Sequence, residues 1–418
     1  WGVLPSGDPA DPSARVMESE GQLSAGDIDG DGLPEIIGLK YTFIPPPDDC
    51  DATDLDCCIR GKFAYGSLYA LEHDGTFKWE SDPWKLPEQY IENAGAPALG
   101  DMNGDGFPEI AFGNAVYDNL GRLIFEGITA TNNERGHGEG GAGHGPMSVF
   151  TDLDGDGKNE LVAGRTAFDA LGRVLWDRYD FGDGLTTVAN VDSDQLPEII
   201  LFNGNNQLIV LESDGTTKYG PIDVPSGSFD EETGEEEGYI ATNPAVGDLD
   251  GDGFPEIVIA ATNLVHVYEH DLTFKWSQSA NDQTGASGPT TFDFEGDGRA
   301  EVVYADEGNV YIWDGVSSAE KYRADRGSRT IVDNPVVADV DNDGHADILL
   351  SMESPVPGGR HGVIAYSNRK NNWVATRRVW NQHAYHITNI SESGIVPAIE
   401  IPNWQTENVY RSNTVRCE

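Results

Sequence analysis

Residues 248–259 read DLDGDGFPEIVI, and the same pattern recurs along the chain, which makes it the main indication of the fold. Acidic or amide side chains stand at its first, third and fifth positions, glycine at the sixth and an acid at the ninth, before an apolar run. The fourth copy has Gln195 in place of the glycine, and the sixth has Glu295 at the third position. The seven copies occupy residues 27–35, 101–109, 152–160, 190–198, 248–256, 293–301 and 339–347. We expect such repeated units to stack around an axis.

The residues around each copy predict four strands per repeat. A short apolar stretch such as 96–100 precedes the acids, a buried apolar strand follows them, and a strand such as 68–71 comes next. The last strand of a repeat carries an aromatic residue, which we expect to pack between neighbouring blades. These residues are Trp79, Phe125, Trp176, Tyr219 and Trp276. Units of this kind close into rings. We therefore predict an all-β fold, a seven-bladed β-propeller with four-stranded antiparallel blades and a calcium loop in each blade. It would span residues 1–418 as one domain, with 381–418 as a C-terminal closing segment.

The acidic loops have the composition of a calcium site. Alternate residues of a tight loop point inward, so positions one, three and five converge and position nine closes the shell with a carboxylate. Glycine at position six permits the turn, because a positive φ costs it little. The sequence thus predicts up to seven Ca²⁺ ions, the degenerate fourth loop included. The predicted ligands are Asp27, Asp29, Asp31, Glu35, Asp101, Asn103, Asp105, Glu109, Asp152, Asp154, Asp156, Glu160, Asn190, Asp192, Asp194, Glu198, Asp248, Asp250, Asp252, Glu256, Asp293, Glu295, Asp297, Glu301, Asp339, Asp341, Asp343 and Asp347.

Two other interpretations of the loops are open. Asp-Gly pairs also make ordinary turns, but turns alone do not explain three or four acids at fixed spacing in seven loops. Magnesium is disfavoured because it keeps its waters and demands octahedral geometry. Without metal the carboxylates of one loop repel one another, so we expect calcium to contribute to folding stability.

The bulk composition restricts partners and compartment. The chain has 72 acidic and 26 basic residues and a net charge of −46, which argues against nucleic acid or an anionic membrane as a partner. No apolar run is long enough to span a membrane. The first residue is not Met, which we interpret as a processed mature form or a fragment. A disulfide between Cys50 and Cys57 or Cys58, with the third cysteine able to reach Cys417, is favoured over free thiols. These features predict a secreted or cell-surface protein.

The seven loops resemble the FG-GAP repeats of the integrin α-subunit-like family of calcium-binding β-propellers, over roughly residues 20 to 380. That resemblance implies that each loop joins the first and second strands of a blade. It also implies calcium ions on one face and ligand sites on the opposite face. The aromatic-containing stretches look like quinoprotein blades as well, but the chain has no quinone-cofactor constellation. Residues 378–386, RVWNQHAYH, resemble the closing region of bacterial surface proteins built from such repeats.

Two places offer polar side chains for a ligand site. The candidate ligand-binding residues are Arg135, His137, Glu139, His144, His383 and His386. The first four lie on the glycine-rich stretch 132–145, which is either a sugar, polymer or transition-metal site or an ordinary surface loop. The last two flank Tyr385 and either belong to the ring closure as structural residues or serve as ligand or base.

No known catalytic motif is present: the chain has no nucleophile elbow, zinc-protease helix, phosphate loop or Cys–His pattern. The sequence therefore favours an extracellular recognition, adhesion or self-assembling surface module. Its partner would be a protein or glycan ligand, or another copy of the chain. The alternative is a carbohydrate-active enzyme, a polysaccharide lyase or hydrolase, with its site opposite the calcium loops. Fold alone does not decide between them, but a deep cleft combining His137 or His144 with Arg135 would favour the enzyme.

Overall fold

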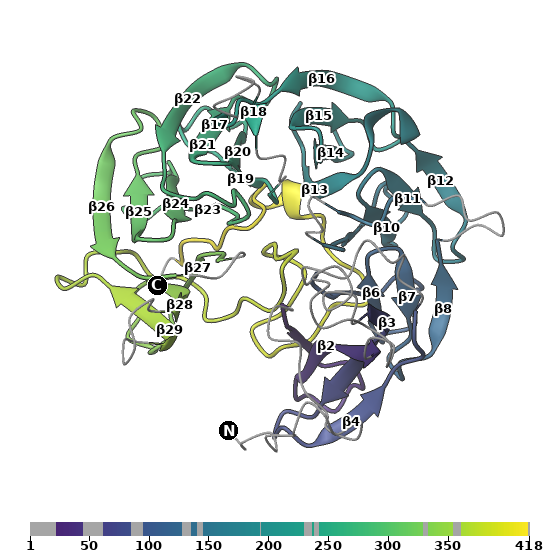
Figure 1. Cartoon of the computed structure of the whole chain (residues 1–418). Helices are drawn as coiled ribbons and strands as arrows, with labels where there is room; N and C mark the ends of the chain where they lie inside the picture. Colours follow the sequence, from purple (N-terminus) through teal and green to yellow (C-terminus); the bar gives the residue numbers. More distant parts are fainter. Residues whose placement is uncertain are drawn as a thin grey trace, which may run out of the picture.

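Seven antiparallel sheets follow one another along the sequence and stand around a common axis (Figure 1). In every sheet each strand pairs with the next strand of the chain, and six of the sheets have four strands. The computed structural model describes residues 22–44, 62–84, 95–127, 135–139, 145–192, 194–229, 236–237, 242–328, 333–353 and 361–416. The predicted seven-bladed β-propeller is confirmed, with one correction: the seventh blade has three strands in this described part.

Each blade is a meander whose first strand lies nearest the axis and whose last strand forms the rim (Figure 1). The first four blades consist of β1 (Ser24–Gly26), β2 (Glu35–Ile44), β3 (Lys62–Leu71) and β4 (Phe77–Glu80); β5 (Ala98–Gly100), β6 (Glu109–Phe112), β7 (Ala115–Tyr117) and β8 (Leu123–Glu126); β9 (Val149–Thr151), β10 (Glu160–Ala163), β11 (Thr166–Phe168) and β12 (Val174–Asp177); and β13 (Gly184–Ala189), β14 (Glu198–Asn203), β15 (Gln207–Leu211) and β16 (Thr217–Asp223).

The remaining blades continue this order. They consist of β19 (Ala245–Gly247), β20 (Glu256–Ala261), β21 (Leu264–Tyr268) and β22 (Phe274–Ser279); β23 (Thr290–Phe292), β24 (Glu301–Ala305), β25 (Asn309–Trp313) and β26 (Glu320–Asp325); and β27 (Val336–Ala338), β28 (Asp347–Glu353) and β29 (His361–Ser367). A hairpin of β17 (Ser228–Phe229) and β18 (Glu236–Glu237) and two short 3-10 helices, η1 (Tyr179–Phe181) and η2 (Asn403–Gln405), lie outside the sheets. No helix in the described ranges is long and apolar enough to cross a membrane.

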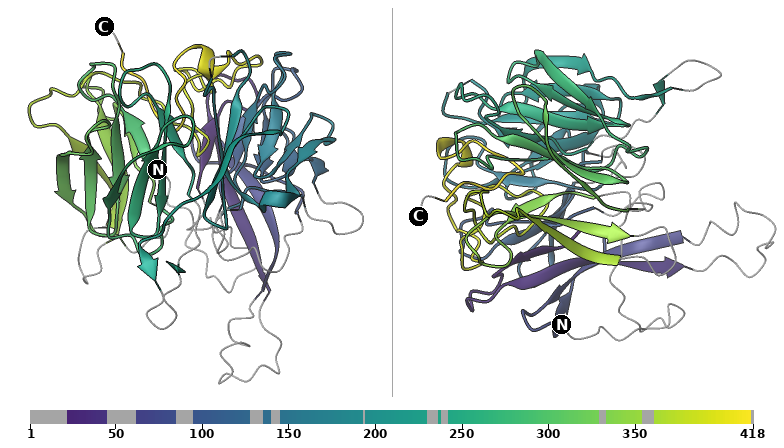
Figure 2. Two further views of the ribbon diagram at one scale, coloured as in Figure 1. Left: turned by 90° about the horizontal axis from the view of Figure 1, so that it is seen from above. Right: turned by 90° about the vertical axis from the view of Figure 1, so that its left-hand side faces the viewer.

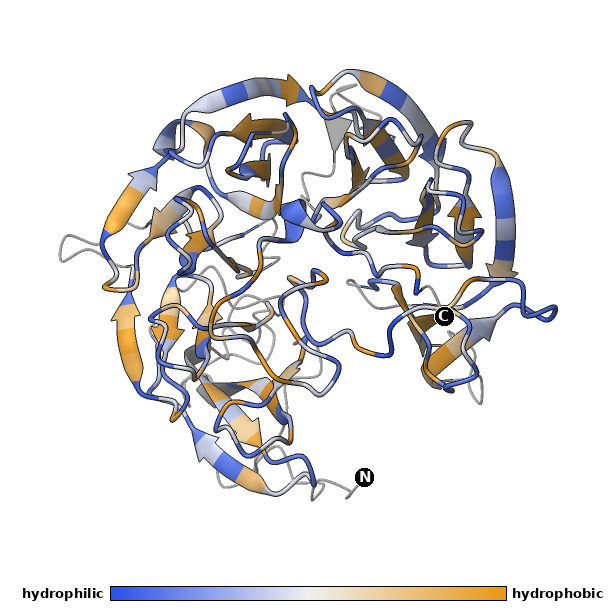
Figure 3. Cartoon of the chain, turned by 180° about the vertical axis from the view of Figure 1, so that it is seen from behind, coloured by the Kyte–Doolittle hydropathy of each residue, from blue (hydrophilic) through white to orange (hydrophobic). Residues whose placement is uncertain are grey.

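The middle strands form the core because apolar residues occupy both of their faces. All six residues of β14 are buried, and the segment Ile199, Ile200, Leu201 and Phe202 is fully inaccessible. A strand covered on both faces needs such a continuous apolar run. The outer strands instead mix exposed and half-buried residues, as β16 does. The inner strands are accordingly mostly hydrophobic in Figure 3, while hydrophilic segments recur along the rim.

Aromatic residues of the outer strands hold neighbouring blades together. The indole N–H of Trp79 in blade 1 donates to the carbonyl oxygen of Asn119 in blade 2, at 3.0 Å. The indole N–H of Trp176 in blade 3 likewise donates to the carbonyl oxygen of Ser213 in blade 4, at 2.9 Å. Each indole therefore packs its apolar body between two blades while its N–H is satisfied. The predicted blade-to-blade packing is confirmed at these positions.

The chain leaves the sheets after β29 and crosses the centre of the ring along one face (Figures 1 and 2). The Asn381 carbonyl accepts the N–H of Ala25 in β1 at 2.8 Å. The Asn413 amide donates to the Val337 carbonyl of β27 at 3.1 Å. The C-terminal segment, residues 374–416, thus connects the first and seventh blades through hydrogen bonds to their innermost strands.

Candidate metal centres

All seven acidic loops join the first and second strands of a blade and so lie on one face of the ring. In each blade the residue before the first loop position pairs with the ninth-position acid. Gly26 opposite Glu35 and Gly247 opposite Glu256 are two examples. The ladder therefore closes each loop at the same point and brings its first and ninth positions together.

The loop backbone wraps around the first acid. In the fifth loop Asp248 accepts the N–H of Gly251 through Oδ1 at 2.6 Å and that of Gly253 through Oδ2 at 3.0 Å. Asp252 Oδ1 in turn accepts the N–H of Phe254 at 2.8 Å. Gly253 has a φ of +91°, the left-handed region that glycine enters at least cost. The sequence spacing thus folds the loop locally, through side chain to backbone bonds within six residues.

The ninth-position acid is buried in every loop. Glu109 and Glu160 are 3% and 8% exposed. The carboxylate of each accepts the backbone N–H of the second residue of its loop, Met102 for Glu109 and Leu153 for Glu160. Burial raises the pKa of both carboxyls to about 7. A carboxylate removed from water requires a compensating cation or proton. These positions are therefore suited to metal ligation.

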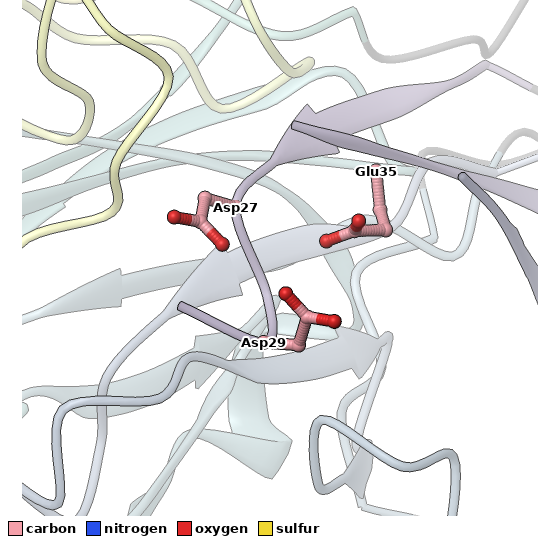
Figure 4. Close-up of side chains that lie close together, drawn as sticks. All are labelled: Asp27, Asp29 and Glu35. Carbon is pink, nitrogen blue, oxygen red and sulfur yellow. The ribbon is translucent and has the colours of Figure 1, made fainter. Parts of the chain in front are cut away.

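In five loops the carboxylates converge closely enough to hold one ion. One oxygen from each of three acids lies within 4.8 Å of the other two, and Figure 4 shows this arrangement for the first loop. The five groups are Asp27, Asp29 and Glu35; Asp152, Asp154 and Glu160; Asp192, Asp194 and Glu198; Asp248, Asp250 and Glu256; and Asp339, Asp341 and Asp347. The second loop has an amide, Asn103, at its third position. In the sixth loop the longer Glu295 turns toward Lys321, 2.7 Å away.

A buried carboxylate oxygen without a hydrogen-bond partner shows whether these groups fit a cation. Asp339 is 5% exposed, and its Oδ1 atom has no hydrogen-bond partner in the described part of the chain. Burying a carboxylate oxygen without a partner is costly. An oxygen-binding cation at the centre of Asp339, Asp341 and Asp347 would supply the missing partner, so the residues fit the group.

The fourth loop departs from the others as its sequence indicates. The Asn190 amide donates to the Asp194 carbonyl at 2.7 Å, and its Oδ1 accepts the Asp192 N–H at 3.2 Å. Asn408 of the C-terminal segment bonds both the N–H and the carbonyl of Asn190, at 2.9 and 2.7 Å. The first position of this loop is thus held in part by the C-terminal segment.

Four lysines approach the loops, and the sequence reasoning missed them. Each lies on the outermost strand of its blade, directly before the strand's aromatic residue, and its ammonium group contacts loop carboxylates. They are Lys78, Lys218, Lys275 and Lys321. The recurring Lys-aromatic pair after the last turn is the signal that could have found them.

The candidate residues 135–139 are tied down by other acids. His137 Nε2 lies 3.0 Å from Glu139 and its Nδ1 lies 3.4 Å from Asp183, whose carboxylate also accepts the backbone N–H groups of residues 137–139. Burial disfavours the charged ring, but Asp183 and Glu139 outweigh it and raise the pKa of His137 to about 9. Arg135 pairs with Asp177. These side chains therefore anchor their own loop, and His144 lies outside the described residues.

The two C-terminal histidines are buried on a different segment. His386 pairs with Glu400 and stacks on Tyr410, with ring centroids 5.9 Å apart. His383 contacts Gln22 and Arg411, and burial together with the Arg411 charge holds its pKa well below the usual range. The structure therefore does not bring the six predicted ligand-binding residues into one site. All four cysteines, and with them the predicted disulfide pairing, also lie outside the described residues.

A cleft of about 580 Å³ opens on the loop face. It lies between the fourth and fifth loops and the turn that contains η2, and Asp194, Asp248, Trp404 and Asn408 line it. This position differs from the face on which the resemblance placed ligand sites.

The fold and the repeated loops define the class of protein. Residues 190–259, 248–304 and 293–350 each match the FG-GAP-like repeat family. Residues 190–350 of this seven-bladed β-propeller thus contain FG-GAP-like repeats, and over this stretch the resemblance inferred from the sequence is confirmed. No curated protein sequence matches the chain significantly.

Solved structures share this fold at low sequence identity. The biofilm matrix protein Bap1 of V. cholerae is 20% identical with a TM-score of 0.70, and the match covers 96% of this chain and 86% of Bap1. The rhamnogalacturonan lyase YesW is 15% identical with a TM-score of 0.50, over 79% of this chain and 58% of the lyase. The likeness to Bap1 thus extends over most of both chains, whereas that to the lyase leaves much of the enzyme unmatched.

Proposed function

We propose that the chain is an extracellular, calcium-stabilised propeller that acts as a recognition, adhesion or self-assembling module at the cell surface. The observation that carries the proposal is the likeness to a biofilm matrix protein over 96% of the chain. The net charge of −46 adds support, because it disfavours nucleic acid and anionic membranes as partners. A protein or glycan ligand, or a second copy of the chain, remains as the partner.

Calcium is the proposed cofactor, in up to seven loops. Hard divalent ions with six to eight oxygen ligands fit a loop that offers carboxylates at alternate positions. The converging carboxylates of five loops and the unpartnered Asp339 oxygen support this assignment. Calcium would then bridge the end of the first strand and the start of the second strand in each blade.

The alternative, a polysaccharide lyase or hydrolase, draws no support from residues 135–139. A general base must be able to accept a proton, whereas His137 is held in its charged form by two carboxylates. Arg135 is likewise occupied by Asp177. We therefore do not propose a catalytic role for this loop.

The test uses the purified full chain in calcium and in chelator. Retention on immobilised extracellular polysaccharides, on a glycan array or on matrix proteins is measured, together with sedimentation as a function of concentration. Retention without product release, or self-association, supports the proposal. A chain that stays monomeric and binds none of these surfaces contradicts it, and release of sugar products would favour the enzyme instead.

A further inference from the structure

A lysine ammonium group occupies the edge of four acidic loops. Lys275 Nζ lies 2.5 Å from Asp250 and 2.9 Å from Glu256, the third- and ninth-position acids of the fifth loop. It also lies 2.8 Å from Glu269, at the end of the third strand. The same three-acid contact recurs in the other blades of this kind: Lys78 with Asp29, Glu35 and Glu72; Lys218 with Asp192, Glu198 and Glu212; and Lys321 with Glu295, Glu301 and Asp314.

Blades 2 and 3 have an aliphatic residue where blades 1, 4, 5 and 6 have lysine. Ile124 and Leu175 directly precede the rim aromatics Phe125 and Trp176, and they are 45% and 50% exposed. The acid at the end of the third strand is instead neutralised within its own turn, as Asp118 is by Arg122 and Asp169 by Arg173. No ion pair reaches the acids of the second and third loops within the described ranges.

The seventh loop also lacks a cation partner. Among the described residues, its blade consists of β27, β28 and β29, and no fourth strand there carries a lysine. None of the ion pairs between described residues involves Asp339, Asp341 or Asp347, and the Oδ1 atom of Asp339 is unpartnered. The loops therefore fall into two groups: the first, fourth, fifth and sixth with a lysine, and the second, third and seventh without one.

The lysine and a calcium ion would share the same carboxylates. Both are cations in contact with the same acidic group, so each weakens the binding of the other, and the low dielectric of a half-buried site strengthens that repulsion. The ammonium group also relieves repulsion among the acids when no metal is bound. We propose that Lys78, Lys218, Lys275 and Lys321 are built-in counter-cations that lower the calcium affinity of their loops and hold those loops together without metal.

It follows that the loops of the ring differ in how tightly they bind calcium and in how much their stability depends on it. The second, third and seventh loops bind calcium tightly and need it, whereas the four lysine loops fill only at higher calcium. The inference rests on calcium binding in the loops, which is part of the proposed function. Loops 3 and 5 provide the cleanest comparison, because both have Asp, Asp, Asp, Gly and Glu at the five key positions and differ in Leu175 against Lys275.

The experiment counts tightly bound calcium in the full chain by equilibrium dialysis. Wild type is expected to hold three ions tightly, with the other sites at least about tenfold weaker. Lys275→Met keeps the aliphatic stem and removes the charge, so a fourth tight site is expected. The reciprocal variant Leu175→Lys is expected to retain two tight calcium sites. Because Leu175 is half exposed, we expect this substitution to leave the fold intact. Thermal unfolding in chelator supplies a second measure: Lys275→Met is expected to melt below wild type there.

Several outcomes would overturn the inference. Seven equivalent sites, an unchanged count in both variants, or a Lys275→Met variant that is more stable in chelator would contradict the lysine assignment while leaving calcium binding intact. A chain that binds no calcium would contradict both this inference and the calcium part of the proposed function.

Discussion

The backbone N–H of Gly253 donates to Oδ2 of Asp248 at 3.0 Å, and it does so from a φ of +91°. No atom lies within 4 Å of a Cβ added at this glycine, so a substitution meets open space and only the backbone conformation opposes it. Together with the bond from the Gly251 N–H to Oδ1 of the same acid, this bond closes the fifth loop around its first acid.

Gly253→Ala is expected to lower the free energy of unfolding by about 1–2 kcal/mol, because a side chain disfavours the left-handed conformation. Gly308→Ala is the matched control: its φ is not left-handed and its Cβ would touch only the Asp306 carboxylate, at 3.8 Å. The control should be neutral or stabilising by about 0.4–1 kcal/mol. Chemical unfolding of both variants checks this, and equal losses would mean that loop geometry is not the cause.

His137 should make stability depend on pH. The facing carboxylates raise its folded-state pKa to about 9, against roughly 6.5 when unfolded. The stabilisation is therefore fully present below pH 6.5 and is lost as the pH rises through 9. His137→Gln should destabilise the chain more at pH 6 than at pH 9.5, whereas the exposed His73→Gln should have the same small effect at both. A penalty for His137→Gln that does not change with pH would refute the charged anchor.

Asn408 should fasten the C-terminal segment to the fourth loop. Its side chain makes two hydrogen bonds to the backbone of Asn190, and its own φ is +50°. Asn408→Gly keeps the backbone conformation and removes both bonds, for an expected loss of about 1–3 kcal/mol. Asn263→Gly is the control, with a φ of +60° and no side-chain hydrogen bond among the described residues. Hydrogen exchange of residues 403–410 should accelerate only in the first variant, and equal exchange in both would contradict this role.

Local patterns predicted the loops because their ligands lie within nine residues of one another. Asp248 and Glu256 are brought together by the first turn of a blade, so their spacing alone carries the geometry. The apolar run after each loop likewise identified the buried second strand, as in β14.

Contacts between segments that are distant in the chain could not be predicted from the sequence. Lys275 reaches Asp250 across 25 residues and two intervening strands, so no motif contains both. His137 and Asp183 are 46 residues apart in the chain, and without that pairing the histidine was indistinguishable from a free ligand group. The buried positions of His383 and His386 depend on how the C-terminal segment packs across the ring.

The most direct test of the account is thermal unfolding of the full chain in excess calcium and in excess chelator. Each occupied site adds about 2.7 kcal/mol when free calcium exceeds its Kd a hundredfold, so several sites together should raise the Tm by many degrees. Equal concentrations of Mg²⁺ should not replace calcium, because the loops offer too few constraints for its octahedral geometry. A Tm that is the same in calcium and in chelator would contradict the claim that metal in the acidic loops holds the ring together.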